Sequence, residues 1–184
     1  MRRRIVVSLA LATLALAACK PPPAATKEYA YPAWGFRISF ASPPQVTDKP
    51  AQPDGTPHSV VAESDGGGRD FAISATDAAD VGVSVDQLTD RLAQMMAGDL
   101  KGEATIKTYA ATAEGLDGRQ FDLKQGGRPV ARVRVFLAGG RFYTLAAKSA
   151  FGLEDPAVGD FLSSFHASQA PVGGTNATAP SPGA

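Results

Sequence analysis

Three arginines interleaved with aromatic residues are the side chains in this sequence best suited to binding chemistry. Arg119, Arg132 and Arg134 lie in segments that alternate apolar and polar residues, as half-buried strands do. Gly126-Gly127 and Gly139-Gly140 separate these segments, and a Gly-Gly pair between such runs is typical of a two-residue hairpin turn. Turns of that length pair residue 119 with 134 and residue 136 with 143. Because residues paired across strands share a face, the pattern predicts one sheet face made of Arg119, Phe121, Leu123, Val130, Arg132, Arg134, Phe136, Tyr143 and Leu145.

Guanidinium groups bind carboxylate and phosphate through two parallel hydrogen bonds. The predicted face could therefore hold an anionic ligand, and the ligand-binding residues that we expect are Arg119, Arg132, Arg134 and Tyr143. Arginine stems also pack along apolar neighbours while their charged ends reach water or carboxylates. A purely structural role for the same residues therefore stays open.

The sequence contains no pattern that predicts catalysis or metal binding. His58 and His166 are the only histidines, and neither belongs to an HxH or HExxH spacing. No G-x-S-x-G nucleophile motif is present. The glycines at 66–68 precede a predicted strand rather than a helix, so they do not form a phosphate-binding loop. We expect no catalytic residue, no metal, no cofactor and therefore no enzyme activity.

The charge distribution argues against a nucleic-acid partner, because nucleic-acid-binding proteins are normally basic. The whole chain has 18 Lys and Arg and 18 Asp and Glu, and without residues 1–18 the balance is 15 to 18. Residues 48–100 carry three basic and ten acidic side chains, whereas residues 101–148 carry nine basic and four acidic ones. This asymmetry predicts either a polar gradient across the fold or ion pairs between the two segments.

The single cysteine, Cys19, is explained by its position. Arginines at 2–4 precede an apolar run at 5–18, which is shorter than the roughly 20 residues of a membrane span. Leu16-Ala17-Ala18-Cys19 resembles the lipobox of bacterial lipoproteins. The resemblance implies cleavage after Ala18 and lipidation of Cys19, whose acyl chains would be embedded in the lipid bilayer.

The residues around this box predict the organisation and location of the chain. We expect a signal peptide at 1–18, a lipidated cysteine with a Pro-rich linker at 19–27, a domain at 28–167 and a disordered tail at 168–184, which is rich in Ala, Pro, Gly, Ser and Thr. In proteobacterial lipoproteins, Asp after the cysteine favours the inner membrane. By that resemblance, Lys20 favours the outer membrane, with the domain facing the periplasm.

Periodicity predicts an α+β domain. Strands are expected near 34–40, 58–63, 70–76, 105–113, 119–125, 129–138 and 141–148. One helix should begin after Ser84, which forms a capping-box pattern with Gln87 and precedes an apolar face that extends to Met96. A second should begin after Asp155, with Pro156 at its first position. The order predicts a single antiparallel, meander-like sheet of six to seven strands flanked by these two helices.

This order resembles the PsbP/Mog1-like family. The resembling features are residues 31–44, which begin Tyr31-Pro32-Ala33-Trp34-Gly35-Phe36, the mid-chain helix, Gly115-Leu116-Asp117-Gly118-Arg119 and Phe161-Leu162-Ser163-Ser164-Phe165. They span nearly the whole domain. The resemblance implies an α/β/α sandwich and an accessory or binding role without transferable catalytic residues.

Two functions remain open from the sequence. The first is an envelope-anchored, non-catalytic accessory module that binds another envelope protein. The alternative is a carrier or sensor of a small anionic or amphipathic ligand, which would use the arginine- and aromatic-lined sheet face.

Overall fold

The computed structural model describes residues 25–79, 82–100 and 103–168 of the chain. The predicted signal peptide, Cys19 with most of its linker, and residues 169–184 of the predicted tail lie outside these ranges. Strand β1 begins at Lys27. At the other end, Ser168 donates its backbone N–H to the Gly35 carbonyl, with the two atoms 2.8 Å apart.

Two antiparallel sheets make up most of the fold, so the class is α+β as predicted, but the prediction of one sheet was wrong. The large sheet has seven strands in the order β3 (Gln45–Lys49), β4 (Ser59–Gly66), β5 (Arg69–Asp77), β9 (Arg141–Ser149), β8 (Arg128–Ala138), β7 (Leu116–Gln125) and β6 (Ala104–Ala113). The small sheet has the order β1 (Lys27–Tyr31), β2 (Phe36–Phe40) and β10 (His166–Ala167). A 3-10 turn, η1 (Pro32–Trp34), joins its first two strands.

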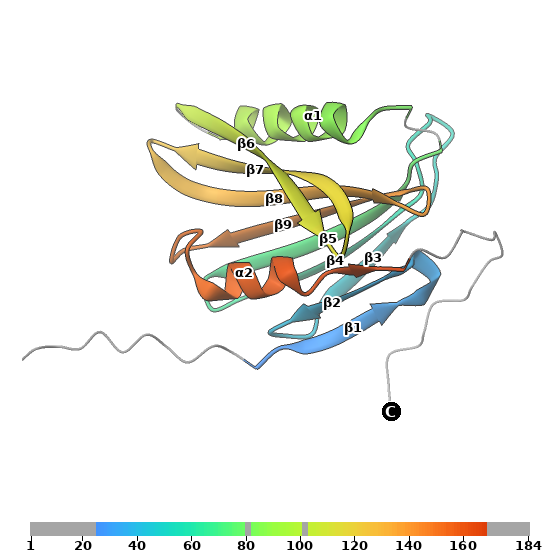
Figure 1. The fold of residues 1–184 in the computed structure, drawn as a ribbon, viewed down its shortest axis with the longest axis horizontal. Helices are drawn as coiled ribbons and strands as arrows, with labels where there is room; N and C mark the ends of the chain where they lie inside the picture. The colour runs from blue at the N-terminus through green and yellow to red at the C-terminus, as the bar shows by residue number, and fades with distance from the viewer. Residues whose placement is uncertain (1–24, 80–81, 101–102, 169–184) are drawn as a thin grey trace, which may run out of the picture.

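The large sheet is covered differently on its two faces (Figure 1). Helix α1 (Val85–Gly98) packs on one face, over β6, β7 and β8. Helix α2 (Pro156–Ser163) and the small sheet cover the other face. The sheet is therefore the middle layer of three.

Both helices begin where the sequence predicted. Ser84 Oγ accepts from the Gln87 backbone N–H at 3.2 Å, and Gln87 Oε1 accepts from the Ser84 N–H at 3.0 Å, which completes the capping box. Asp155 Oδ1 accepts from the Ala157 N–H at 3.2 Å and caps α2. These two caps satisfy backbone donors that the helices themselves leave unpaired.

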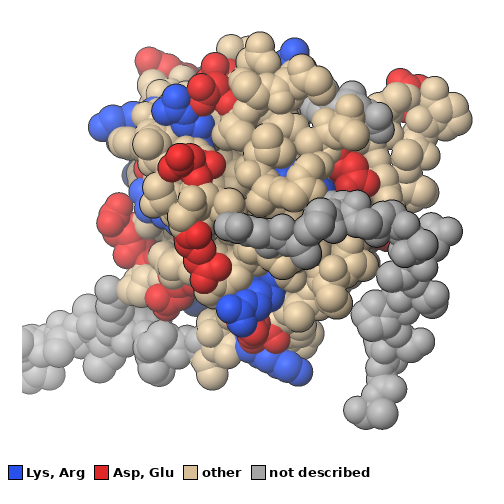
Figure 2. All heavy atoms as spheres, turned by 45° about the vertical axis from the view of Figure 1, so that its right-hand side comes forward, with Lys and Arg blue, Asp and Glu red and all other residues tan. Residues whose placement is uncertain are grey.

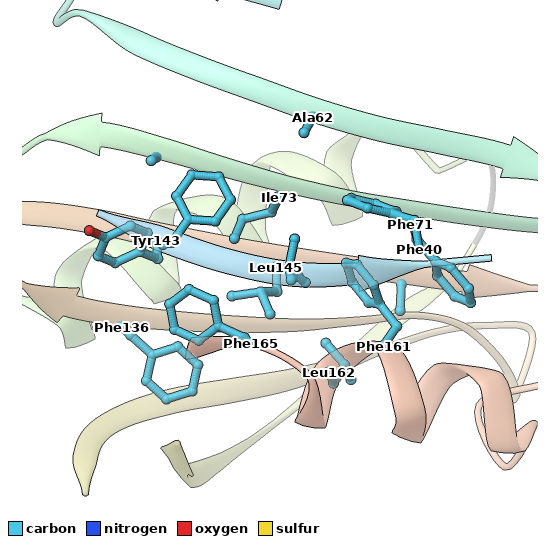
Figure 3. Packing of buried hydrophobic residues seen from close by; sticks show 14 of the residues in the cluster. Phe40, Ala62, Phe71, Ile73, Phe136, Tyr143, Leu145, Phe161, Leu162 and Phe165 are labelled. Atoms are coloured by element: carbon cyan, nitrogen blue, oxygen red, sulfur yellow. The ribbon is translucent and has the colours of Figure 1, made fainter. Parts of the chain in front are cut away.

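Aromatic side chains fill the space between the large sheet and its lid of α2 and the small sheet (Figure 3). Phe161 of α2 stacks on Phe71 of β5 with ring centroids 4.8 Å apart and lies 5.4 Å from Phe40 of β2. Phe165 lies 5.3 Å from Tyr143 and 5.6 Å from Phe136. We call this set the aromatic core; it joins the first and last segments of the domain to the middle of the sheet.

The two Gly-Gly turns form as predicted, but the register between β7 and β8 differs by one residue. Gly126 and Gly127 have φ of 55° and 78°, the left-handed values that a two-residue hairpin turn requires. Lys124 pairs with Pro129, whereas Leu123 pairs with Ala131, so Val130 is an extra residue that forms a bulge. Proline has no backbone N–H to donate, and strands accept it at such bulges.

Gly118 allows β7 to pass close to β8. An ideal Cβ at this position would lie 2.7 Å from Cε1 of Phe136 and would also collide with the carbonyl oxygen of Val135. The backbone carbonyl cannot move without breaking the pairing of Gly118 with Phe136. The close approach therefore depends on the missing side chain.

We predict that Gly118→Ala lowers the free energy of unfolding by about 2 kcal/mol, because the added methyl overpacks this contact. Urea denaturation of the two proteins measures the difference. Gly159→Ala is the matched control, since its Cβ would meet nothing within 4 Å in the middle of α2. That change should stabilise the protein by about 0.8 kcal/mol through helix propensity. Equal stability of Gly118→Ala and the parent would contradict the packing argument.

Candidate functional site

The bulge at Val130 separates the residues of the predicted arginine face. Arg119 pairs with Val135 rather than Arg134, so Arg119 lies on the face covered by α1. There its guanidinium forms an exposed ion pair with Asp86 in the first turn of α1. Arg134 pairs with Gln120 and lies on the opposite face. The prediction that Arg119 and Arg134 face each other was therefore wrong, because beyond the bulge the one-residue shift places each β7 side chain, up to Leu123, on the other face relative to β8.

Arg132 is held by a carboxylate. Its Nε and Nη2 each donate to Asp122 at 2.8 Å, and Gln120 Nε2 donates to the same carboxylate at 3.2 Å. The hydrogen bonds to Asp122, which is 7% exposed, raise the pKa of Arg132. The ion pair of Arg132 with the buried Asp122 therefore joins β8 to β7.

Arg134 has only neutral hydrogen-bond partners among the described residues. Its Nε donates to Gln120 Oε1 at 2.9 Å and its Nη1 donates to the Leu162 carbonyl at 3.3 Å. Burial, together with the positive charge of Arg132, lowers the pKa of Arg134. Leu162 lies in the last turn of α2, where a cation is favourable to the helix dipole. The contact gives Arg134 a structural role, and its Nη2 has no acceptor among the described residues.

Tyr143, the fourth predicted ligand-binding residue, lies in the aromatic core. Its side chain is 1% exposed, and its hydroxyl donates to the Trp34 carbonyl at 3.0 Å. Burial raises the pKa of this hydroxyl. The side chain therefore holds the η1 turn against the sheet and does not reach solvent.

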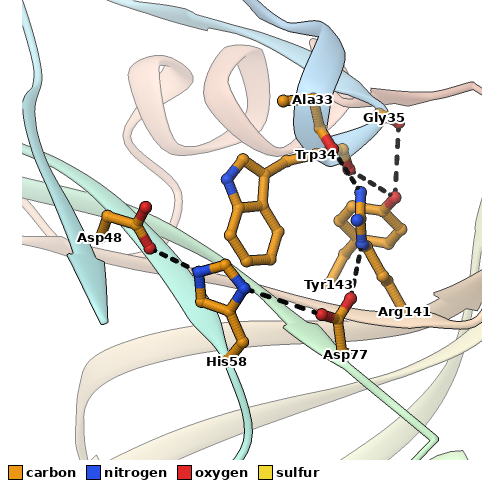
Figure 4. Close-up of polar contacts among 8 residues, drawn as sticks. All are labelled: Ala33, Trp34, Gly35, Asp48, His58, Asp77, Arg141 and Tyr143. Carbon is orange, nitrogen blue, oxygen red and sulfur yellow. Dashed lines mark hydrogen bonds and ion pairs between the residues drawn. The ribbon is translucent and has the colours of Figure 1, made fainter. Parts of the chain in front are cut away.

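A cluster that the sequence did not predict lies next to that turn (Figure 4). Arg141 Nε donates to Asp77 Oδ1 at 2.8 Å and its Nη1 donates to the Ala33 carbonyl at 2.8 Å. The same guanidinium lies over the Trp34 ring, 4.8 Å from its centroid, in a cation–π contact. The edge of the His58 ring meets Trp34, with ring centroids 4.6 Å apart. We call Trp34, Asp48, His58, Asp77 and Arg141 the Trp34 cluster.

The chemistry of the Trp34 cluster favours positioning over catalysis. His58 Nε2 lies 2.7 Å from Asp48 Oδ1, and His58 Nδ1 lies 4.0 Å from Asp77 Oδ2. Both ring nitrogens therefore face carboxylates, so neither is directed at a nucleophile or a substrate position. The cluster ties η1 to the ends of β4, β5 and β9.

No local pattern could have revealed this cluster. Its members come from five segments of the chain, and each occurs in an ordinary context: an edge strand, a turn or a strand end. Contacts between distant segments bring them together: Asp77 pairs with Arg141 across β5 and β9, and the Asp77 backbone N–H donates to the His58 carbonyl.

A third polar group fixes the start of α2. Arg69 Nε donates to Asp155 Oδ2 at 2.7 Å, and Ser149 Oγ donates to the same oxygen at 2.7 Å. The hydrogen bond from Arg69 is the main cause of the lowered pKa of Asp155. One nearly buried carboxylate thus caps α2 and ties it to β5 and β9.

The acidic and basic segments of the sequence meet through ion pairs. Asp86 with Arg119 and Asp77 with Arg141 each join an acid from 48–100 to an arginine from 101–148. Figure 2 shows acidic and basic side chains interspersed on the face in view. The charge pattern predicted either a polar gradient or ion pairs between the two segments, and the structure contains ion pairs.

A concavity of about 520 Å³ opens beside α1, at the end of the large sheet that includes the β4–β5 hairpin. Its lining combines apolar and charged residues, among them Phe71, Met96, Glu63, Asp70 and Lys148. Within the described part of the chain, no group of three or more His, Cys, Asp or Glu side chains could hold a metal ion. The described helices include none long and apolar enough to span a membrane.

Comparisons with known proteins support the fold. No protein-family model and no curated protein matches the chain. A similar solved structure is the solution structure of cyanobacterial PsbP (CyanoP) from Synechocystis sp. PCC 6803, with a TM-score of 0.53 and 16% sequence identity. The match covers 83% of this chain and 98% of that one. The fold is therefore PsbP-like, as the resemblance in the sequence implied, and at this identity the likeness concerns the fold alone.

The Asp155 carboxylate predicts a specific acid sensitivity. A folded-state pKa below the unfolded value of about 3.9 stabilises the protein above that pH, and this stabilisation is lost as the pH falls through the folded pKa. We expect Asp155→Asn to lower the free energy of unfolding by about 2 kcal/mol at pH 7, because a charged hydrogen-bond acceptor is lost. The difference should shrink below about pH 4.

Urea denaturation of parent and variant between pH 3 and pH 7 measures this difference. Glu154→Gln is the control, because it removes one negative charge from the adjacent exposed side chain. A pH-independent gap between parent and Asp155→Asn would rule out the linkage.

Proposed function

We propose that this chain is an envelope-anchored lipoprotein whose PsbP-like domain acts as a non-catalytic accessory module that binds another envelope protein. In this proposal, acylated Cys19 holds the protein on the outer membrane with the domain facing the periplasm. The anchor is supported by the Leu16-Ala17-Ala18-Cys19 box behind a charged and apolar segment. The choice of the outer membrane is supported by Lys20.

The linker is short, so it limits how far the domain can lie from the membrane. Residues 20–26 can span at most about 25 Å when fully extended, so the start of β1 at Lys27 would stay within that distance of the lipid surface.

The observation that carries the accessory role is the internal pairing of the polar clusters. Asp122 neutralises Arg132, Asp155 neutralises Arg69, and Asp77 neutralises Arg141, each as a contact between elements of the fold. Catalytic acids and bases have to be directed at a substrate, whereas these groups are directed at one another. A fold of this kind supports a role in which the surface, and not an internal site, makes the functional contact.

The lipid anchor predicts that the mature protein begins at Cys19 and carries acyl chains on that residue. Mass spectrometry of the N-terminal peptide from purified envelopes measures this directly. Cys19→Ala is the control: it removes the thiol that accepts diacylglycerol, and the protein should then leave the membrane fraction. An N-terminus at another residue, or an unmodified Cys19 thiol, would end the lipoprotein proposal.

A second candidate function is the binding of a small anionic ligand, and the state of Arg134 favours it. This half-buried guanidinium has a charged neighbour of the same sign, Arg132, and only neutral acceptors among the described residues. The Asp122 carboxylate acts on Arg134 but is hydrogen-bonded to Arg132, so a ligand carboxylate or phosphate would supply Arg134 with a countercharge of its own. In its corrected form, this candidate site includes Arg132 and Arg134 and excludes Arg119 and Tyr143.

Thermal unfolding tests this candidate. Phosphate or a fatty-acid carboxylate should raise the Tm of the parent protein, because a ligand at 100 times its Kd stabilises by about 2.7 kcal/mol. Arg134→Leu should abolish that response, whereas Arg119→Leu, the same change on the other face, should keep it. A parent protein that responds to neither anion would leave Arg134 with only its structural contacts to Gln120 and Leu162.

A further inference from the structure

The two edges of the large sheet are protected very differently. β3 is only five residues long, carries Asp48 and Lys49, and is bounded by Pro44 and Pro50. Short length, charges and prolines are the usual features that prevent an edge strand from pairing with another chain. This edge is therefore closed to strand addition.

β6, at the other edge, has few of these features. It is ten residues long, contains no proline, and has Lys107 as its single charge. Residues 105–110 are all exposed, among them Ile106 at 40% and Tyr109 at 37%. Within the described part of the chain, β7 is the strand with which β6 pairs, and no other backbone hydrogen bond involves residues 104–113. Among the described residues, half of the backbone groups of this long, nearly uncharged strand therefore have no hydrogen-bond partner.

We infer that β6 is the interface between two copies of this chain, which pair antiparallel through residues 105–111 and join their large sheets into one. A free strand edge is a template for such pairing, because each new main-chain hydrogen bond uses a group that is already ordered. The inference goes beyond the proposed function and does not depend on the lipid anchor.

The sequence of β6 is self-complementary when the twofold axis passes through Thr108. Thr108 then faces its own copy, Ile106 faces Ala110, and Lys107 faces Tyr109. Lys107 already lies over its own Tyr109 ring, with Nζ 5.2 Å from the centroid. Pairing extends this cation–π contact between the two chains. In this register each Lys107 faces Tyr109 of the other copy, so the two like charges do not lie directly opposite each other.

The neighbouring registers are less favourable. An axis through Lys107 would place two ammonium groups directly opposite each other, which destabilises a sheet. An axis through Tyr109 would extend the interface to Ala113, where β6 turns in: Ala111 and Ala113 pack against the aromatic core, and Glu114 contacts His166 of β10. The Thr108 register ends at the half-buried Ala111, so it keeps the interface almost entirely within the exposed residues 105–110.

Disulfide crosslinking tests the register. Opposite Cα atoms in an antiparallel pair lie about 4.5–5.5 Å apart, which is within the range of a disulfide. In the full mature chain with Cys19→Ser, Thr108→Cys introduces a single cysteine, because the sequence contains no other. Mild oxidation should convert most of this protein into a covalent dimer.

Thr105→Cys in the same background is the matched control. Residue 105 is also an exposed threonine of β6, but in this register it faces Ala111, about 20 Å along the strand from its own copy. Equal crosslinking of the two variants, or none of Thr108→Cys, would overturn the proposal even if Cys19 proves to be lipidated.

Sedimentation measures the affinity without a crosslink. The unlipidated full chain should sediment as a concentration-dependent dimer. Thr108→Lys should weaken dimerisation by about fivefold, because two like charges then meet at the axis. A parent protein that remains monomeric at every concentration, or an equal dissociation constant for Thr108→Lys, would also overturn the proposal.

Discussion

The aromatic core is the interaction on which the rest of this fold depends. The chain has one cysteine, so no disulfide within it can hold the lid of α2 and the small sheet on the large sheet. Stacking of Phe161 on Phe71, and contacts of Phe165 with Phe136 and Tyr143, do this instead. Aromatic pairs contribute about 0.5–1.5 kcal/mol beyond the burial of their area. Their edge-on and stacked geometries also fix the orientation of the lid.

Charged side chains add further contacts between the lid and the large sheet. Arg69 with Asp155 and Arg141 with Asp77 lie at opposite ends of the β5–β9 pair, where each ties one part of the lid to the sheet. Arg132 with Asp122 and Arg134 with Leu162 lie beside the core, between β7, β8 and α2. Burial of apolar surface is the dominant stabilising term in folding, and these directional polar contacts favour one position of the lid.

Local signals predicted the local structure well, and the remaining differences came from long-range contacts. Ser84 and Gln87 identified the start of α1 because a capping box lies within four residues. β1, β3 and β10 were missed because they are short and pair with strands whose identity the sequence does not show. The arginine face was wrong because of one bulged residue. Pro129, two positions after the turn, was the available sign of it, since a proline there cannot join the ladder of hydrogen bonds. The Trp34 cluster had no such sign.

The pairing of β10 with β2 has a consequence for how the domain reaches its native state. His166 pairs with Arg37, and Ser164 Oγ accepts from the Ser39 backbone N–H at 3.0 Å, so the first and last parts of the domain meet across almost its whole length. Contacts between residues so far apart in sequence form slowly, because a large loop must close first. A chain emerging from a ribosome or a translocation pore cannot complete its small sheet until residue 167 is available. Until then the small sheet lacks its third strand, so the lid over the aromatic core is incomplete.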